Sequence, residues 1–310
     1  MIWNYISPIL PDDLGLISLL AEEGNLKVRT SHSYYNTAQR EGPMDLELEG
    51  KTAVVTGASR GIGKAGAREL ALSGCDVVIC ARRPEDLELS ARELSQETGR
   101  KVVGITADTT STPDVERMIK EAADVLGRID ILVNNAAAPG GIARGPFASI
   151  SYDDVLDDLN TKVVGYLRCA RAVGPYMTEQ GWGRIVNIGG LSARNANGAN
   201  VSAGIRNAGL VNLTKYLSQQ LGPSGVTVNL VHPGATRTER SGPMYEEQAR
   251  QQGISVEEAE ARVAANNATN RIVDASELAY VVAFLASPRS IAISGEVIAA
   301  GGGSGQAVYH

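Results

Sequence analysis

The sequence is poor in the residues that build metal sites and disulfide frameworks. It has three cysteines and three histidines, widely separated and without the spacing of metal ligands: Cys75, Cys80, Cys169, His32, His232 and His310. Two of the cysteines lie in or beside an apolar stretch, so we interpret all three as small buried hydrophobes in a reducing compartment. The sequence therefore predicts no metal site and no disulfide.

Signals for a membrane or a nucleic acid are also missing. No apolar run approaches the length of a membrane span, and the N-terminus lacks the charged, apolar and cleavage regions of a secretory leader. The 29 basic residues are outnumbered by 35 acidic ones, which gives a net charge of −6 and no basic surface for nucleic acid. We expect a cytoplasmic protein with neither kind of partner.

What the chain does contain is an alternation of short β-branched runs and helical patterns from Lys51 onward. Its 310 residues are 43% hydrophobic, which is ample for a buried core. Repeated βα units with short connections predict an α/β fold, a three-layer doubly wound parallel sheet of the Rossmann type, in a single domain over 44–303. The polar segment 235–273, with helices expected at Tyr245–Gln252 and Val256–Ala265, is interpreted as a substrate lid.

One long helix is expected from Ser151, with Asp154 completing its capping box. Its apolar stripe is predicted to run through Val155, Leu159, Val163, Leu167, Ala170, Val173 and Met177.

The two ends of the chain do not follow the alternating pattern. Residues 1–43 are interpreted as an N-terminal extension outside the core, with a short amphipathic helix at Asp12 to Glu23 and a polar, mobile stretch from Arg29 to Gly42. Either Met44 is the functional start or this segment is a lineage-specific arm. Residues 304–310 are expected to be a C-terminal tail.

The most informative stretch is Thr56-Gly57-x-x-x-Gly61-x-Gly63, which joins a β-branched run to an alanine-rich helix. Glycine allows the tight turn and lets a phosphate approach bare backbone, while the helix N-terminus favours negative charge. We therefore predict a dinucleotide site.

The end of the second strand indicates which dinucleotide binds. An NAD-binding fold needs an acid there for the ribose 2′-hydroxyl, whereas this chain has Arg82 and Arg83, with Arg60 in the glycine turn. Cations attract a 2′-phosphate, so NADP(H) is favoured over NAD(H). The remaining predicted cofactor contacts follow the strands or lie in the turn: Ser59, Ile62, Asp108, Thr109, Asn135, Ala136, Ala137, Pro233, Gly234 and Thr236. Asn207, in the helix that ends at Gly222, is a further candidate that could hydrogen-bond a ribose hydroxyl.

With these motifs, residues 46–303 resemble the short-chain dehydrogenase/reductase family. The resemblance rests on the glycine turn, on Asn134-Asn135-Ala136-Ala137, on Asn160 in the long helix, on Pro233-Gly234, and on the segment from Ser294 to Gly302. It implies a nicotinamide cofactor, a small carbonyl or alcohol substrate, and a homodimer or homotetramer packed through two long helices.

The resemblance breaks at the catalytic positions. Those enzymes use a serine, a tyrosine thirteen residues later and a lysine four after that; the corresponding residues here are Gly190, Ala203 and Asn207. Of the usual tetrad only Asn160 remains. The candidate replacements are Ser192, Ser202 and Arg206, although serines in this region are also ordinary capping residues and an arginine an ordinary ion-pair partner.

Three functions stay open at this point. The favoured one is an NADP(H)-dependent oxidoreductase of the carbonyl reductase or alcohol dehydrogenase type with an atypical proton donor. The second is an NADP(H)-binding sensor or subunit without redox turnover, since losing a general acid costs about 10²–10⁴ in rate. The third, a non-redox lyase on the same fold, fits the intact glycine turn least.

Overall fold

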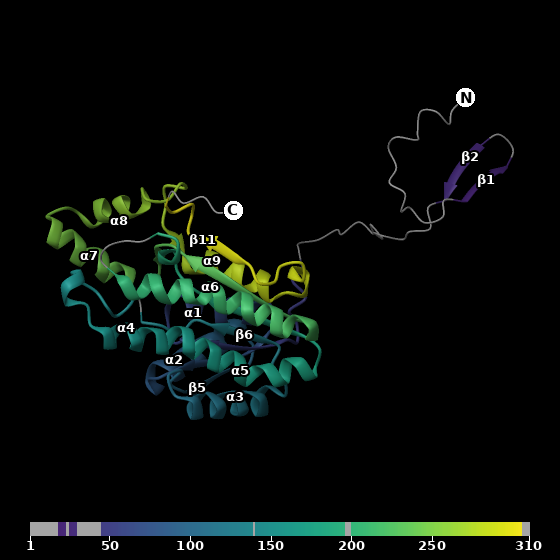
Figure 1. Ribbon diagram of the computed structural model, residues 1–310, viewed down its shortest axis with the longest axis horizontal. Coiled ribbons are helices and arrows are strands. Elements are labelled where there is room, and N and C mark those ends of the chain that lie inside the picture. Colours follow the sequence, from purple (N-terminus) through teal and green to yellow (C-terminus); the bar gives the residue numbers. More distant parts are fainter. Residues whose placement is uncertain (1–17, 23–24, 30–44, 139, 196–199, 306–310) are drawn as a thin grey trace. The chain divides into compact units, whose positions relative to one another are not determined.

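The computed structural model describes residues 18–22, 25–29, 45–138, 140–195 and 200–305 (Figure 1). Its contacts divide the chain into two compact units, Met1–Asp45 and Leu46–His310. Each unit is treated by itself below.

In the first unit, two short strands pair antiparallel: β1 (Ser18–Glu22) and β2 (Asn25–Arg29), with Leu20 opposite Lys27. The helix predicted from Asp12 to Glu23 is therefore wrong over residues 18–22, and its remainder lies outside the described residues. The reason is that a strand needs a partner, and the segment 25–29 supplies the backbone groups that a local helical pattern does not anticipate.

The second unit contains the predicted parallel sheet. Seven strands are hydrogen-bonded in the order β11-β8-β7-β6-β3-β4-β5. Their bounds are β3 (Thr52–Thr56), β4 (Asp76–Ala81), β5 (Val102–Thr106), β6 (Ile131–Asn134), β7 (Gly183–Ile188), β8 (Val226–Pro233) and β11 (Val297–Ala300). The order reverses between β3 and β6, and ligands of such sheets bind beyond the strand ends at that point.

Helices cover both faces of the sheet, which makes the three predicted layers (Figure 1). One core cluster joins the sheet to α1 (Gly61–Leu72), α2 (Pro84–Thr98) and α9 (Ala275–Ala286). The other joins the opposite face to α3 (Thr112–Leu126), α5 (Gly165–Glu179) and α6 (Val201–Leu221). Short 3₁₀ turns complete the connections: η2 (Phe147–Ser149), η4 (Leu191–Ala193), η5 (Gly222–Ser224) and η6 (Pro288–Ser290).

The single long helix predicted from Ser151 is interrupted. α4 (Tyr152–Leu159) leads into a π-helical turn, η3 (Asn160–Val164), and only then into α5. Because a π turn holds one extra residue, it rotates the inward face by about one position. The second half of the predicted apolar stripe is buried, whereas its first half is half-exposed or exposed, and the inward positions there are Asp158, Lys162 and Tyr166.

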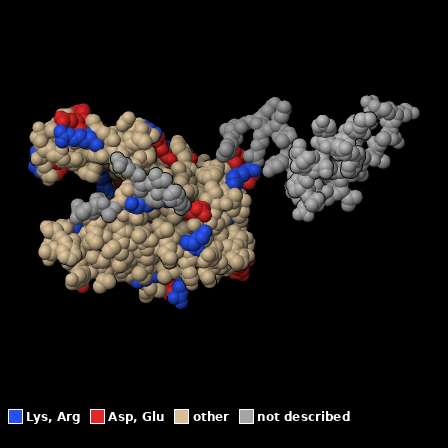
Figure 2. All heavy atoms as spheres, turned by 45° about the horizontal axis from the view of Figure 1, so that its top comes forward, with Lys and Arg blue, Asp and Glu red and all other residues tan. Residues whose placement is uncertain are grey.

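The predicted lid segment 235–273 forms a small lobe. A two-residue parallel pair, β9 (Thr236–Arg237) with β10 (Val273–Asp274), closes its base, and α7 (Ser241–Gln252) and α8 (Val256–Ala264) build it. The two predicted helices are confirmed, the first beginning four residues earlier than expected. Charged side chains gather on this lobe, and a notch separates it from the neighbouring surface of the same unit (Figure 2).

The three cysteines are buried and unpaired, as predicted. Burial raises the pKa of the Cys75 and Cys80 thiols to about 12, so both are protonated at neutral pH. Within the described ranges, no helix combines the length and apolar character that crossing a bilayer requires. The same residues contain no cluster of three or more side chains suited to a metal.

Candidate active site

The glycine turn follows β3 and is fastened to the loop after β6. Thr56 Oγ1 accepts the backbone N–H groups of Asn135 and Ala136 at 3.0 and 3.2 Å. In return, Asn135 Nδ2 donates to the carbonyl oxygens of Thr56 (3.1 Å) and Gly57 (2.9 Å). Two loops predicted to contact the cofactor are thereby held together at the switch point of the sheet.

This close approach explains why the turn contains glycine. Gly57 has φ of +64°, and a Cβ there would stand 2.7 Å from Ala136 Cα. A Cβ at Gly63 would lie 2.5 Å from the Gly57 carbonyl oxygen. Backbone therefore lines the turn at the N-terminus of α1, and these residues fit a bound pyrophosphate.

The Glu239 carboxylate of the lobe contacts the N-terminus of α1. The backbone N–H of Gly61, the first residue of α1, donates to Glu239 Oε1 at 2.8 Å. A hollow of about 370 Å³ adjoins the contact and is lined by residues of α1, of the lobe and of α9, including Lys64, Arg237 and Thr238. The lobe and the glycine turn are thus directly connected.

The predicted cationic residues lie in two places: Arg82 and Arg83 directly follow β4, and Arg60 is the N-cap of α1. Arg60, Arg82 and Arg83 are exposed, and Arg83 pairs with Asp86. Among the described residues, Arg60 and Arg82 form no ion pair with an acidic side chain. Arg82 lines a hollow of about 280 Å³ together with the end of β5 and the start of α3.

Asp108 lies in the same hollow, directly after β5. Its Oδ1 accepts both the N–H (2.9 Å) and the hydroxyl (2.8 Å) of Thr110. The neighbouring Thr109 is buried, and its carbonyl accepts Arg168 Nη1 at 3.2 Å.

The other predicted cofactor contacts surround these loops. Gly234 lies close to Gly301: a Cβ added at Gly234 would lie 3.0 Å from the Cα atom of Gly301. Thr236 Oγ1 donates to the Gly234 carbonyl at 3.2 Å. Four more are half-buried: Ser59, Ile62, Ala137 and Pro233.

Gly190, Ala203 and Asn207 meet beside the end of β7. Gly190 precedes η4, while Ala203 and Asn207 are buried on α6. A Cβ added at Gly190 would lie 2.7 Å from Asn207 Nδ2, so the asparagine amide fills the space beside that glycine. The same Nδ2 donates to Ser192 Oγ at 2.9 Å, and Ser192 donates to the Ala203 carbonyl at 3.1 Å.

A buried lysine lies behind this amide. Lys162 Nζ, from the π turn η3, donates to Asn207 Oδ1 and to the Gly189 carbonyl, each at 2.9 Å. Burial, and secondarily the nearby Arg206, lowers the pKa of Lys162 well below its usual range, while Asp158 opposes this shift.

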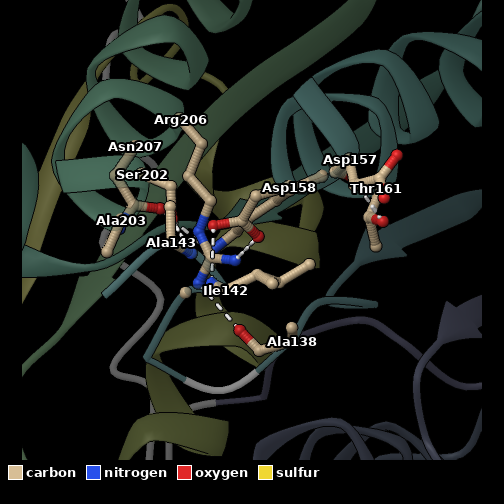
Figure 3. A network of polar contacts seen from close by, with 12 residues as sticks. Ala138, Ile142, Ala143, Asp157, Asp158, Thr161, Ser202, Ala203, Arg206 and Asn207 are labelled. Carbon is tan, nitrogen blue, oxygen red and sulfur yellow. Dashed lines mark hydrogen bonds and ion pairs between the residues drawn. The ribbon is translucent and has the colours of Figure 1, made fainter. Parts of the chain in front are cut away.

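Arg206 and Asp158 form a buried ion pair that anchors the loop after β6 (Figure 3). Arg206 Nη2 also donates to the Ala138 carbonyl at 2.9 Å, and Asp158 Oδ2 accepts the Ile142 N–H at 3.2 Å. Ser202 Oγ accepts the Ala143 N–H at 3.2 Å. The two candidate replacements on α6 are thus connected to Ala138, Ile142 and Ala143 of the loop after β6.

Asn160 begins η3, half-buried. Its Oδ1 accepts Arg168 Nη2 at 2.8 Å, and its carbonyl accepts Arg168 Nη1 at 3.3 Å. The structure therefore brings Ser192 and Asn207 together. Ser202 and Arg206 bind the loop after β6 instead, and Asn160 binds Arg168.

His232, near the end of β8, is completely buried next to Gly190. Its Nδ1 accepts the Gly190 N–H at 2.9 Å. Burial, reinforced by Arg194 and Lys162, lowers the pKa of His232 to about 4, so the ring is neutral at physiological pH.

Comparison with known proteins adds the family. Residues 57–304 match the family model described as Enoyl-(Acyl carrier protein) reductase. The 3-oxoacyl-(acyl-carrier-protein) reductase FabG of Vibrio harveyi is 34% identical over 259 residues, which cover 83% of this chain and 98% of that protein. The chain belongs to the short-chain dehydrogenase/reductase family.

Two solved structures of short-chain reductases agree in fold. L-Sorbose reductase from Gluconobacter frateurii, complexed with NADPH and L-sorbose, is 26% identical with a TM-score of 0.81, covering 86% of this chain and all of that one. Actinorhodin polyketide ketoreductase with NADPH is 34% identical with a TM-score of 0.75, covering 82% and 96%. The predicted enzyme class, an NAD(P)-dependent oxidoreductase acting on carbonyl or hydroxyl groups, is confirmed.

Four residues of this short-chain reductase site were not anticipated from the sequence: Asp158, Lys162, His232 and Glu239. A signal was present for two of them, because Asp158 and Lys162 are charged residues one helical turn apart beside an apolar stripe. The π turn, which makes their face the inward one, leaves no comparable mark in the sequence.

Proposed function

We propose that this protein is an NADP(H)-dependent carbonyl reductase or alcohol dehydrogenase in which the Ser192 hydroxyl is the proton donor. The observation that carries the proposal is the pairing of Ser192 with Asn207 beside Gly190. Of the hydroxyl and guanidinium candidates, Ser192 is half-exposed, whereas Ser202 and Arg206 are buried and committed to the loop after β6.

The preference for NADP(H) is supported by charge. Arg82 is exposed at the end of β4 and Arg60 is exposed at the N-cap of α1, and a 2′-phosphate offers such cations charge-assisted hydrogen bonds that a 2′-hydroxyl cannot. The sorbose reductase and the ketoreductase to which this chain is similar contain NADPH.

When bound, the reduced cofactor supplies a hydride to the carbonyl carbon. The chain's own part is then to hold the cofactor and to protonate the resulting alkoxide. The glycine turn and the loop after β6 would hold the pyrophosphate, with Arg60 and Arg82 at the ribose. Glu239 accepts the Gly61 N–H in this structure. When the lobe moves as a lid over the substrate, this N–H becomes available to the pyrophosphate.

The test has two arms. NADPH is expected to bind with micromolar or tighter affinity, and a panel of carbonyl compounds should show NADPH oxidation. Ser192→Ala is expected to lower kcat by about 10²–10⁴ without weakening NADPH binding, since it removes only the general acid. Ser218→Ala on α6 is the control. Binding without oxidation of any carbonyl would favour a nucleotide-binding protein without turnover.

Cofactor choice is tested separately with Arg82→Asp. Removing one charge-assisted hydrogen bond, worth about 1.5–3 kcal/mol, should lower the NADPH/NADH ratio of kcat/KM by roughly 10- to 100-fold. Arg92→Asp, an exposed change of equal charge on α2, is the control. An unchanged ratio for Arg82→Asp would refute the assignment of Arg82 to the 2′-phosphate.

We also propose that the chain pairs with a second copy through the surface of α4, η3, α5 and α6. This surface exposes large apolar side chains: Tyr152, Leu156, Val164, Leu167, Val201, Ile205 and Tyr216. Exposed apolar side chains on helices that contact one another are typical of an interface. Leu156→Glu, judged by light scattering, should yield monomers where the natural chain gives a dimer or tetramer.

A further inference from the structure

The site contains a buried lysine, and within the described part of the chain no carboxylate forms a hydrogen bond or ion pair with it. Lys162 is 4% exposed, and among the described residues its amine donates to two neutral acceptors, the Gly189 carbonyl and Asn207 Oδ1. The neighbouring acid, Asp158, already pairs with Arg206 through Oδ1 and accepts the Ile142 N–H through Oδ2. Burying an ammonium without a paired carboxylate is costly, and such groups concentrate at functional sites.

The ammonium decides how the Asn207 amide is turned. An ammonium has only hydrogen-bond donors, so it can bind the amide only through the amide oxygen. With Oδ1 held at Lys162, Nδ2 must face the opposite way, toward Ser192 Oγ at 2.9 Å. Lys162, Asn207 and Ser192 therefore form one directed chain of donors, which continues from Ser192 Oγ to the Ala203 carbonyl at 3.1 Å. To protonate a substrate, the Ser192 hydroxyl turns from that carbonyl toward the substrate oxygen.

The missing side chain at position 190 makes room for this chain. An added Cβ at Gly190 would stand 2.7 Å from Asn207 Nδ2 and would push the amide away from Ser192. Three elements contribute to the arrangement: η3 carries the lysine, α6 the asparagine, and η4 the serine.

We propose that Lys162 is a positioning residue of this reductase, which orients the Asn207 amide and through it makes the Ser192 hydroxyl a better acid. The proposal rests on the proposed function. During reduction the O–H bond of Ser192 breaks and its proton joins the carbonyl oxygen, whose carbon has received the cofactor's hydride. The serine oxygen left behind accepts the N–H of Asn207 and regains a proton from water, because Ser192 is half-exposed.

A direct test is Lys162→Met, which keeps an unbranched apolar stem of similar volume and removes the ammonium. We expect kcat to fall by about 10²-fold, as for an oriented donor, while the Kd for NADPH changes less than about twofold. Lys120→Met, an exposed change of the same kind on α3, is the control.

The pH profile separates positioning from mere packing. Lys162 faces Asp158 of α4, Arg206 of α6 and His232 of β8, and its pKa is lowered by burial and by Arg206. The protonated amine donates to the amide oxygen more strongly than the neutral amine, whose lone pair could also accept the other end of the amide, so kcat of the natural enzyme should fall as pH rises through this lowered pKa. That alkaline limb should be absent from Lys162→Met.

A second variant stays informative if Lys162→Met folds poorly. Asn207→Asp gives Lys162 a carboxylate partner, so the protein should be at least as heat-stable, yet it offers no donor to Ser192 at neutral pH. Its kcat should fall to within about tenfold of that of Ser192→Ala. An unchanged kcat in Asn207→Asp, or an alkaline limb that persists in Lys162→Met, would overturn the positioning role of Lys162 and leave the proposed function standing. Absence of turnover in the natural chain would overturn the proposed function and this role with it.

Discussion

At the scale of single residues, the site is built around one glycine. Gly190 leaves space that Asn207 occupies, and its N–H is accepted by the neutral ring of His232. A protonated Nδ1 would face that N–H as a second donor, so folding requires His232 to be uncharged. The same geometry that seats the amide therefore makes the fold sensitive to acid.

We expect this sensitivity to show in the stability of the protein. The pKa of His232 is lowered to about 4 in the fold, against about 6.5 in the unfolded chain. Between these two pH values the unfolded chain therefore binds more protons than the folded one. The free energy of unfolding is unaffected by His232 above pH 6.5, and it declines as pH falls toward 4, by up to about 3 kcal/mol.

His232→Asn is the matched comparison, because an amide oxygen can accept the Gly190 N–H without titrating. Urea unfolding of both proteins from pH 4 to 8 should show their stabilities diverging below about pH 6.5. Parallel curves would show that the ring is not held neutral by the fold.

At the scale of elements, the π turn η3 and the lobe after β8 give the sheet its particular chemistry. One extra residue in η3 rotates Lys162 and Asp158 inward, and an apolar stripe predicted for the same helix turns partly outward. The lobe, closed at its base by β9 and β10, reaches the glycine turn through Glu239. Both elements modify a standard cofactor site without changing the sheet.

Glu239 should compete with the phosphates of the cofactor. Glu239 accepts the Gly61 N–H at the N-terminus of α1, and the phosphates are expected to accept the same N–H. The helix dipole stabilises an anion at this position by up to about 1 kcal/mol. Glu239→Gln is therefore expected to bind NADPH roughly three- to fivefold more tightly in a calorimetric titration at low salt. Glu246→Gln, exposed on α7, is the control; equal or weaker binding by Glu239→Gln would contradict the competition.

At the scale of the whole molecule, the second unit contains every residue of the candidate site. The seven-stranded sheet, both core clusters and the lobe all lie within Leu46–His310. A domain with its own core folds independently of what is attached to it.

A chain beginning at Met44 should accordingly fold and bind NADPH as the full chain does. We expect equal Kd values within about twofold, and melting temperatures within a few degrees, measured by calorimetry. A large loss of stability would show instead that residues 1–43 complete the core.

The sequence by itself determined the parallel sheet, the glycine turn and the cationic end of β4. These follow from patterns that are local: β-branched runs, turn glycines, and caps such as Ser151 with Asp154. The family resemblance follows from the same short segments, and so did the expectation that Gly190, Ala203 and Asn207 occupy the catalytic positions.

Only the tertiary structure decided how those positions are filled. The ammonium of Lys162 reaches Asn207 across 45 residues of sequence, and the Glu239 carboxylate reaches Gly61 across 178. Such contacts depend on how helices are rotated and on which loops the sheet brings to one edge, and a one-residue π turn changes both without altering the local pattern. The two strands at 18–29 were missed for the same reason, because a strand is stabilised by a partner that its own residues do not specify.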